Sequence, residues 1–169
     1  GPVMSKIISI AMLLAAALGL YVIRVQMSKL DEEVVYAHYQ KSIDATQMFD
    51  AKTLCGMMDR DYRAVDVAKT PRGEERTDMN RKQACTAMRE SMAMMKEVVA
   101  ATRLKPDFKY VIESVTLSPD RRQAVVKMRA SMRIGKRISV SSAGTETLVR
   151  RMGRVLSKGS DTRSTVSVR

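Results

Sequence analysis

The feature that most constrains this chain is an uncharged apolar run near its N-terminus. Residues 7–23 carry no charged side chain, and Lys6 and Arg24 bracket them. At 1.5 Å per residue, a helix over this run is about 25 Å long, near the short end of what crosses a bilayer. Such a surface has to enter a membrane, pack against a partner or be removed by cleavage. The water-soluble body must therefore come from the remaining residues.

An uncleaved membrane anchor is the interpretation that this segment favours. A secretory signal peptide also has a basic start and an apolar run, but small residues mark its cleavage site. Here Ala15–Ala17 lie inside the run, and the bulky residues 20–24 come after these alanines. Cleavage after export and packing into a partner remain alternatives. The orientation across a membrane is undetermined, because Lys6 and Arg24 flank the run on both sides.

We divide the chain into three segments. Residues 1–3 are typical of the remnant left when a protease removes a fusion tag. Residues 4–30 are the predicted anchor helix and juxtamembrane segment, and residues 31–169 are the predicted soluble domain. One domain plus an appendage is the expected organisation for 169 residues.

The first part of the domain has the periodicity of helices. Val35 and Tyr39 repeat at four-residue spacing after an acidic start, which predicts a helix over 31–49. A short helix near 51–58 and a strand over 62–69 follow, and a helix that continues through residue 68 is the alternative. Residues 70–78 contain Pro and Gly and predict a turn.

The longest helix is predicted over residues 78–103, with Thr77 as its N-cap. Apolar side chains recur there at steps of three and four residues, which is typical of a core-facing surface: Cys85, Met88, Met92, Met95 and Val99. His38 lies off the apolar stripe of its own helix, so we predict that it is exposed.

From residue 105 the pattern changes to strands joined by short turns. In "RRQAVVKMRASMRIG", residues 121–135, apolar and polar side chains alternate, which predicts a strand with one buried face. Four such strands with short connections predict an antiparallel meander. The apolar parity changes between Val140 and Val149, so a β-bulge that curves the sheet is predicted at Gly144.

This order of elements resembles the nuclear transport factor 2-like (NTF2-like) superfamily, a cone-shaped α+β roll, over residues 31–169. The resemblance rests on "FDAKTLCGMMDRDYRAVDV", the long helix and "TETLVRRMGRVLSKGSD". It implies an α+β fold with three helices packed on a curved antiparallel sheet. With the N-terminal helix, the layout is also similar to the membrane-anchored envelope subunits of type IV secretion machines.

Positive charge is concentrated in the second part of the chain. Residues 104–169 hold 15 Lys and Arg against 5 Asp and Glu, while the whole chain carries a net +12. The wet face of the 121–135 strand is the predicted interaction surface: Arg121, Lys127, Arg129 and Arg133. It suits an acidic protein or anionic lipid headgroups, although simple solubility explains it too. Self-association through the sheet is a further alternative, as the resemblance implies. Nucleic acid is disfavoured, because the strands from 121 onward lack aromatic side chains for stacking.

The two cysteines, Cys55 and Cys85, predict one disulfide and hence an oxidising compartment. Two buried thiols are the alternative. The sequence contains no cysteine or histidine spacing typical of a metal site, and no cofactor is predicted.

The cone of this fold provides a second interpretation, a soft apolar pocket. The side chains predicted to line it are Met88, Met92, Met128, Met132 and Tyr110. Isomerase-type members of the superfamily pair an Asp with a Tyr inside the cone. The candidates for such a pair are Asp59, Asp61 or Asp66 with Tyr62 or Tyr110, but the acids lie beside Arg60 and Arg63, which would lower their pKa. No catalytic residue is therefore assigned.

We predict a membrane-anchored binding or assembly module without catalytic activity. Its anchor would lie in a bacterial inner membrane, with the domain in the periplasm and protein partners in an envelope complex. Binding of a small lipid-like ligand in the cone is the alternative function, and an isomerase or dehydratase is a weaker one.

Overall fold

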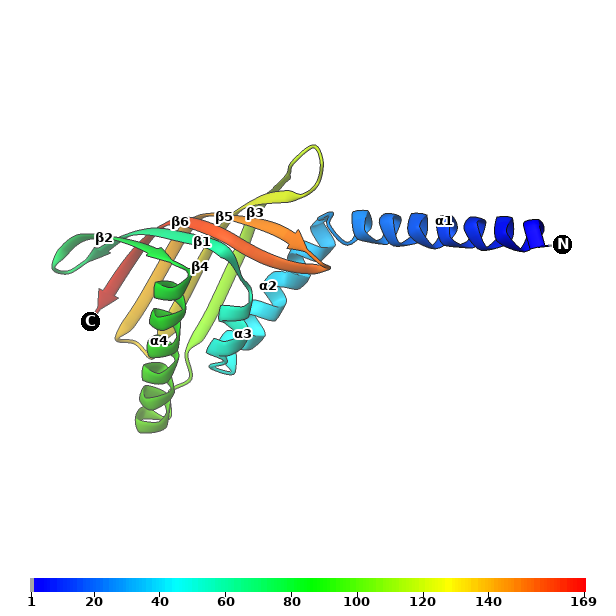
Figure 1. Ribbon diagram of the computed structural model, residues 1–169. Coiled ribbons are helices and arrows are strands. Elements are labelled where there is room, and N and C mark those ends of the chain that lie inside the picture. Colours follow the sequence, from blue (N-terminus) through cyan, green and yellow to red (C-terminus); the bar gives the residue numbers. More distant parts are fainter. Residues whose placement is uncertain (1) are drawn as a thin grey trace.

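The protein is an α+β fold in which a long N-terminal helix projects away from a helix-covered sheet (Figure 1). The computed structural model describes residues 2–169, apart from the side chains of residues 2, 3 and 5. Gly1 lies outside the described residues, and with it part of the predicted tag remnant.

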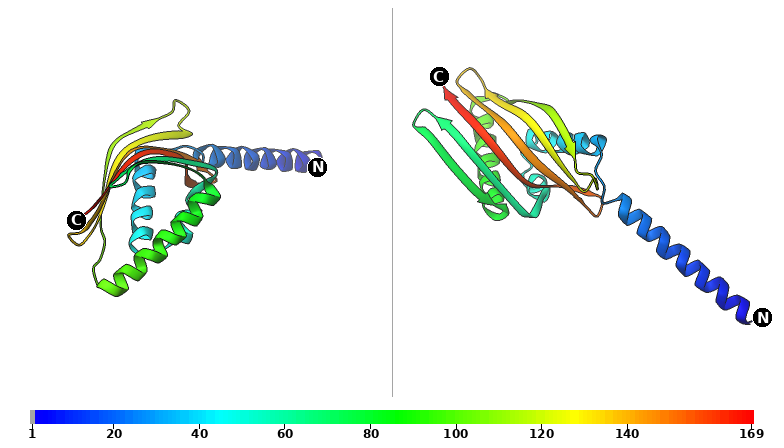
Figure 2. Two further views of the ribbon diagram at one scale, coloured as in Figure 1. Left: turned by 90° about the vertical axis from the view of Figure 1, so that its left-hand side faces the viewer. Right: turned by 90° about the horizontal axis from the view of Figure 1, so that it is seen from above.

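The projecting helix α1 runs from Pro2 to Gln26. Its stretch Lys6–Gln26 spans 21 residues with a mean hydropathy of 2.2, and none of that stretch is buried. Both views of Figure 2 show α1 leaving the body without packing on it. By length and composition this helix is able to cross a membrane, as an anchor or a signal sequence would.

Two further helices begin at aspartate caps, which the sequence analysis did not assign. Helix α2 (Glu32–Gln47) starts after Asp31, whose side chain accepts a hydrogen bond from the Val34 amide, and α3 (Ala51–Gly56) starts in the same way after Asp50. His38 on α2 is only 8% exposed, so the prediction of an exposed histidine is wrong. Its ring packs edge-on against Tyr39, at the border of the apolar stripe.

The structure adds a strand where a turn is predicted. Strand β1 (Met58–Thr70) folds back into β2 (Gly73–Asn80) through a two-residue turn. The sequence of β2 does not indicate a strand, because this charged edge strand has no alternation of apolar and polar residues. Helix α4 (Arg81–Thr102) is confirmed, but its cap is Asn80, which forms a capping box with Gln83. The predicted cap, Thr77, lies within β2.

The four-strand meander is confirmed as β3 (Asp107–Leu117), β4 (Gln123–Ile134), β5 (Ile138–Arg151) and β6 (Arg154–Val168). The six strands form one sheet in the order β2-β1-β6-β5-β4-β3. All neighbours are antiparallel except β1 and β6. Helices α2, α3 and α4 cover the same face of this curved sheet (Figure 2).

The predicted bulge at Gly144 is wrong in position. Strand β5 stays in register with β4 throughout, whereas its pairing with β6 passes from Thr147↔Gly159 to Leu148↔Ser157. The extra residue is therefore Lys158 on β6. Gly144 has another role, since a Cβ there would lie 2.7 Å from Cα of Thr162. It permits a close approach between the two strand backbones.

The apolar core lies between the helices and the sheet. One cluster is centred on Leu30, Val35, Tyr39, Val126 and Leu148. A second joins α2, α3 and α4 through residues that include Leu54, Met57, Met92 and Met95. Between α2 and the sheet this packing is incomplete, and a cavity remains there.

Candidate ligand-binding site in the cone

A cavity of about 400 Å³ lies between α2 and the helix-facing side of β3, β4 and β5. Its apolar wall includes Ile43, Phe108, Met128, Met132 and Val140. The lining also includes polar residues: Tyr39, Ser42, Thr46, Lys109, Ser131, Ser142 and Glu146. A mostly apolar hollow with a few converging polar groups is the usual form of a small-molecule site.

Glu146 on β5 is the one carboxyl group among the residues that line this cavity. Its Oε1 accepts a hydrogen bond of 2.5 Å from the Tyr39 hydroxyl, and its Oε2 accepts one of 2.9 Å from the Ser157 hydroxyl. Burial raises the pKa of Glu146, although these two hydrogen bonds oppose the shift. Burial and the neighbouring carboxyl likewise raise the pKa of Tyr39. The site thus holds a buried carboxyl group whose pKa is raised.

The predicted pocket-lining residues divide into two groups. Tyr110, Met128 and Met132 line the cavity, and the Tyr110 ring stacks on Tyr39 with centroids 6.3 Å apart. Met88 and Met92 lie elsewhere, packed in the cluster that joins the helices. The long helix therefore closes the core and does not line this cavity.

Sequence reasoning missed Glu146 and Tyr39. Glu146 shares its parity with Ile138, Val140 and Leu148, so a continuous β5 turns all four toward the helices. Placing a bulge at Gly144 reversed the expected direction of Glu146. The available signal was an acid on the apolar parity of a strand.

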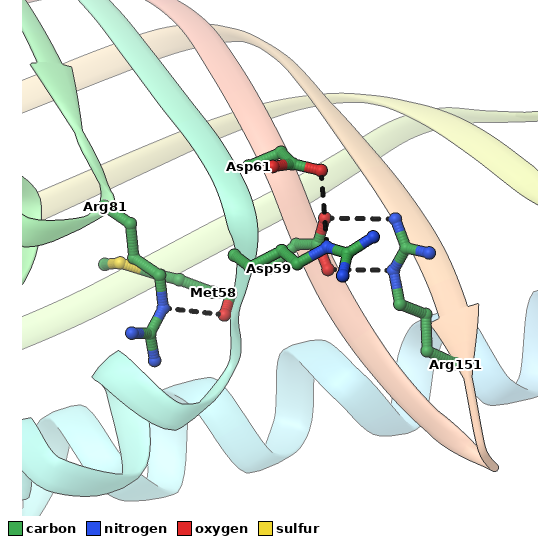
Figure 3. A network of polar contacts seen from close by, with 6 residues as sticks. Met58, Asp59, Asp61, Arg81 and Arg151 are labelled. Atoms are coloured by element: carbon green, nitrogen blue, oxygen red, sulfur yellow. Dashed lines mark hydrogen bonds and ion pairs between the residues drawn. The ribbon is translucent and has the colours of Figure 1, made fainter.

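The acids proposed for an isomerase-type pair are engaged elsewhere. Asp59 is 2% exposed and forms two hydrogen bonds with Arg151, of 2.8 and 3.2 Å (Figure 3). Burial alone would raise the pKa of Asp59, but the hydrogen bonds and charge of Arg151 outweigh it and lower the pKa. Asp61 pairs with Arg60 in solvent at 3.6 Å.

The remaining members of that predicted set are also separate from the cavity. Asp66 accepts hydrogen bonds from the hydroxyls of Thr162 and Ser164. Tyr62 is buried beside α4, 3.4 Å from the Ser160 hydroxyl. None of these acids meets Tyr62 or Tyr110 among the described hydrogen bonds, so the structure forms none of the candidate Tyr–Asp pairs. It brings together Tyr39 and Glu146 instead.

The predicted interaction surface is partly neutralised within the chain. Glu113, the extra residue where β3 shifts register, accepts a 2.7 Å contact from Arg129 and lies 3.7 Å from Lys127. Arg133 stands opposite Asp107 on β3. Arg121 lies in the turn before β4, where its guanidinium donates to the Leu30 carbonyl at 2.9 Å. It holds the segment between α1 and α2 and is not part of the strand face.

The two cysteines face one interface, as predicted, but the predicted disulfide is absent. Both thiols are free, and Cys55 Sγ lies 3.7 Å from the carbonyl oxygen of Cys85. Both side chains pack between α3, α4 and β1. The residues that the structure describes include no group of three or more His, Cys, Asp or Glu side chains suited to a metal ion.

No family profile and no curated protein sequence matches the chain. Solved structures do. A conserved protein from Planctomyces limnophilus is 15% identical with a TM-score of 0.57, over 82% of this chain and 98% of that one. NTF2-like proteins of unknown function from Silicibacter pomeroyi and Pseudomonas putida have TM-scores of 0.53 and 0.55 at 12% and 10% identity. They cover 78% of this chain and 93% and 84% of their own. These likenesses establish an NTF2-like fold.

Proposed function

We propose that this protein is a membrane-anchored binding module whose cone takes up a small, mostly apolar ligand. The observation that carries the proposal is the cavity of about 400 Å³ with Glu146 and Tyr39 at its polar side. Its volume lies within the range of 300–1,000 Å³ that is typical of small-molecule sites.

The chemistry of the wall limits what this cavity accepts. The buried Glu146 carboxyl group offers one polar anchor for a carbonyl or hydroxyl group of an otherwise apolar ligand. Both oxygens of Glu146 already accept hydrogen bonds from the protein. This arrangement supports a role in positioning a ligand, and we assign no catalytic step to it.

The anchor places the cone close to a source of apolar ligands. Helix α1 exposes its whole apolar surface, which supports insertion into a bilayer. We place the helix in a bacterial inner membrane and the domain in the periplasm, by likeness in layout to type IV secretion envelope subunits. A disulfide would have been independent support for a periplasmic domain, but both thiols are free, so that support is absent.

A second candidate function is protein docking through the outer sheet face and its rim. A hollow of about 310 Å³ at the β4–β5 hairpin is lined by basic side chains that include Arg133, Lys136 and Arg137. None of these three has an ion-pair partner among the described residues, so an acidic surface of an envelope partner would suit them. A sedimentation measurement of the R133Q/K136Q/R137Q variant with an acidic peptide tests this docking.

The cone proposal is tested with a variant that fills the cavity. Ala130 lines the hollow, while Ala143 on the adjacent strand is exposed, so Ala130→Leu and Ala143→Leu are matched. The full chain is purified in mild detergent, and extracted small molecules are identified by mass spectrometry. Wild type and Ala143→Leu should retain a common apolar compound that Ala130→Leu loses. Equal retention by all three proteins, or none by any, contradicts the proposal.

The anchor is tested independently. Full-length protein expressed in a bacterium should stay in the membrane pellet after alkaline carbonate extraction, and a C-terminal phosphatase fusion should be active in the periplasm. Release by carbonate rules out the anchor, and an inactive fusion rules out the periplasmic placement alone.

A further inference from the structure

A second large groove lies outside the cone, between the end of α1 and the tip of the β5–β6 hairpin. It encloses about 820 Å³. Helix α1 and the residues just after it contribute one wall, which includes Tyr21, Arg24 and Met27. The sheet contributes the other, which includes Arg122 from the β3–β4 turn and Met152 from the hairpin tip.

The groove is strongly cationic. Its lining includes five basic side chains: Arg24, Arg122, Arg150, Arg151 and Lys158. Arg151 is engaged by Asp59, and Arg150 donates to the backbone carbonyls of Lys29 and Gly153.

The other three cations have no carboxylate within ion-pair distance among the described residues. Arg24, Arg122 and Lys158 are all exposed. Asp120, two residues before Arg122, accepts hydrogen bonds from the Ser118 hydroxyl and the Arg122 amide, and its carboxylate interacts electrostatically with Arg122. Asp120 offsets part of the charge of Arg122, but the five basic side chains leave the groove with a net positive charge, which favours an anionic group.

The position of α1 relative to this groove is fixed by backbone contacts. The Met27 carbonyl accepts a 3.1 Å hydrogen bond from the Gly153 amide, and the Lys29 carbonyl accepts one of 2.9 Å from Arg150. Leu30 exchanges hydrogen bonds of 2.6 and 2.9 Å with the backbone and guanidinium of Arg121. The hairpin tip and the β3–β4 turn therefore hold the segment Met27–Leu30, which follows the apolar helix, and we call this set of contacts the clasp.

This clasp determines the depth at which the groove meets a bilayer. When the uncharged residues 7–23 span the hydrocarbon core, Arg24 stands at the interface and Tyr21 lies about one turn deeper. Aromatic and basic side chains favour these levels. Met152, which is 75% exposed at the hairpin tip, lies beside them. Arg24, Arg122 and Lys158 are then at the level of the lipid phosphates.

We propose that this groove binds the phosphate headgroup of an anionic phospholipid, with the acyl chains lying along the apolar surface of α1. The inference rests on the membrane anchoring proposed above, but not on the ligand of the cone. Arg24 approaches from the helix and Arg122 and Lys158 from the sheet, so one headgroup would join the helix to the domain. Lys158 reaches this position because it is the extra residue of β6.

The experiment compares lipid retention by the full chain and two sets of variants. The groove variants are R24Q/R122Q/K158Q and R122Q/K158Q, the second of which leaves α1 unchanged. The matched control K69Q/R72Q/R76Q removes three cations from the β1–β2 hairpin, at the opposite end of the sheet (Figure 1). Each protein is placed in nanodiscs of phosphatidylcholine with roughly 30% phosphatidylglycerol, and bound lipid is counted by native mass spectrometry.

Wild type and the hairpin control should retain phosphatidylglycerol over phosphatidylcholine. The affinity should fall on the order of fivefold for each groove cation removed. Equal loss in the hairpin control would show unspecific surface charge and overturn the site. Displacement of the lipid by millimolar glycerol phosphate would identify a soluble phosphate site instead.

The outcome also separates this inference from the proposed anchor. If wild-type protein is released from membranes by carbonate, both fall. If it resists extraction and the groove variants retain phosphatidylglycerol as wild type does, only the headgroup site is overturned.

Discussion

The Tyr39 hydroxyl donates a 2.5 Å hydrogen bond to Oε1 of Glu146, a residue 107 positions further along the chain. The contact joins α2 to β5 at the polar side of the cone. Burial raises the pKa of Glu146, and this bond opposes the shift. The strength of the contact therefore depends on whether Glu146 is protonated, and so on pH. The same contact links the stability of the domain to its candidate site.

Replacing Glu146 with Gln should change the pH dependence of stability. The folded-state pKa of Glu146 is raised, so its stabilising contribution is complete below the unfolded value near 4.5 and is lost as pH rises through the folded pKa. Gln does not titrate. In urea unfolding, the free energy of unfolding of Glu146→Gln should therefore rise relative to that of wild type between pH 5 and pH 8. A difference that is independent of pH contradicts the assignment.

A double-mutant cycle should measure the Tyr39–Glu146 hydrogen bond directly. Tyr39→Phe, Glu146→Gln and the double variant are unfolded in urea at pH 7. Because the bond is enclosed and involves an acidic group, we expect a coupling energy of about 1–2 kcal/mol. Tyr36→Phe, on an exposed side chain of the same helix, is the control and should change stability little. A coupling near zero would show that the contact is energetically unimportant.

Arg151→Gln should destabilise the domain by about 2–3 kcal/mol at neutral pH, because it leaves the buried Asp59 carboxylate without its partner. This loss is smaller than the roughly 3–5 kcal/mol typical of breaking a fully buried ion pair, because the Arg151 side chain is 45% exposed. The pKa of Asp59 is lowered, so the pair stabilises above the unfolded value near 3.8 and loses its effect as pH falls through the folded value. Denaturant titrations at pH 7 and pH 3 measure this.

Arg60→Gln is the matched control for that prediction. Arg60 and Asp61 are 81% and 64% exposed, and an exposed pair contributes roughly 0–1 kcal/mol. Equal losses in the two variants would show that burial of Asp59 does not determine the strength of its ion pair.

His38 should make the domain less stable in mild acid. Burial, opposed by a backbone hydrogen bond with Val155, lowers the pKa of His38 to about 4. The unfolded chain binds the proton near 6.5, so stability falls as pH drops from 6.5 toward 4, by at most about 3 kcal/mol. His38→Gln should flatten this decline in thermal unfolding between pH 7 and pH 4. An unchanged slope, or an imidazole that titrates near 6.5 by NMR, contradicts the burial.

Cys55 should react slowly with iodoacetamide in the native protein. Burial, with a smaller effect of the neighbouring Cys85, raises the pKa of the Cys55 thiol to about 11. At pH 8 only about a thousandth of the thiol is then ionised, and the thiolate is the reactive form. Intact mass spectrometry should show little native labelling and two adducts in guanidinium without reductant. A single labelled species that needs reductant for two adducts would indicate a disulfide.

Much of the architecture is readable from local periodicity. The four-residue spacing of Val35 and Tyr39 and the alternation in residues 121–135 report which faces are buried, since a regular helix or strand repeats its exposure. Strand β2 could not be predicted in this way. It is an edge strand with charged side chains, so its pairing with β1 and not its own pattern makes it a strand.

The candidate site was less accessible because it depends on the register of one strand. The sequence showed an acid at position 146 and apolar residues on both parities of the segment that forms β5. Only the pairing of β5 with both neighbours places the extra residue on β6, at Lys158, which turns Glu146 into the cone and Lys158 toward α1. A shift of one residue reverses the face of every side chain that follows.

By itself, the sequence determined the apolar span, the helices and the meander, because each follows from contacts between residues a few positions apart. The tertiary structure alone decided that Tyr39 meets Glu146, that Asp59 is buried under Arg151 and that Arg121 holds Leu30. These contacts join residues that are about 90 or more positions apart, and the packing of helices on a curved sheet brings them together. Their hydrogen bonds depend on that packing and leave no periodic trace in the chain.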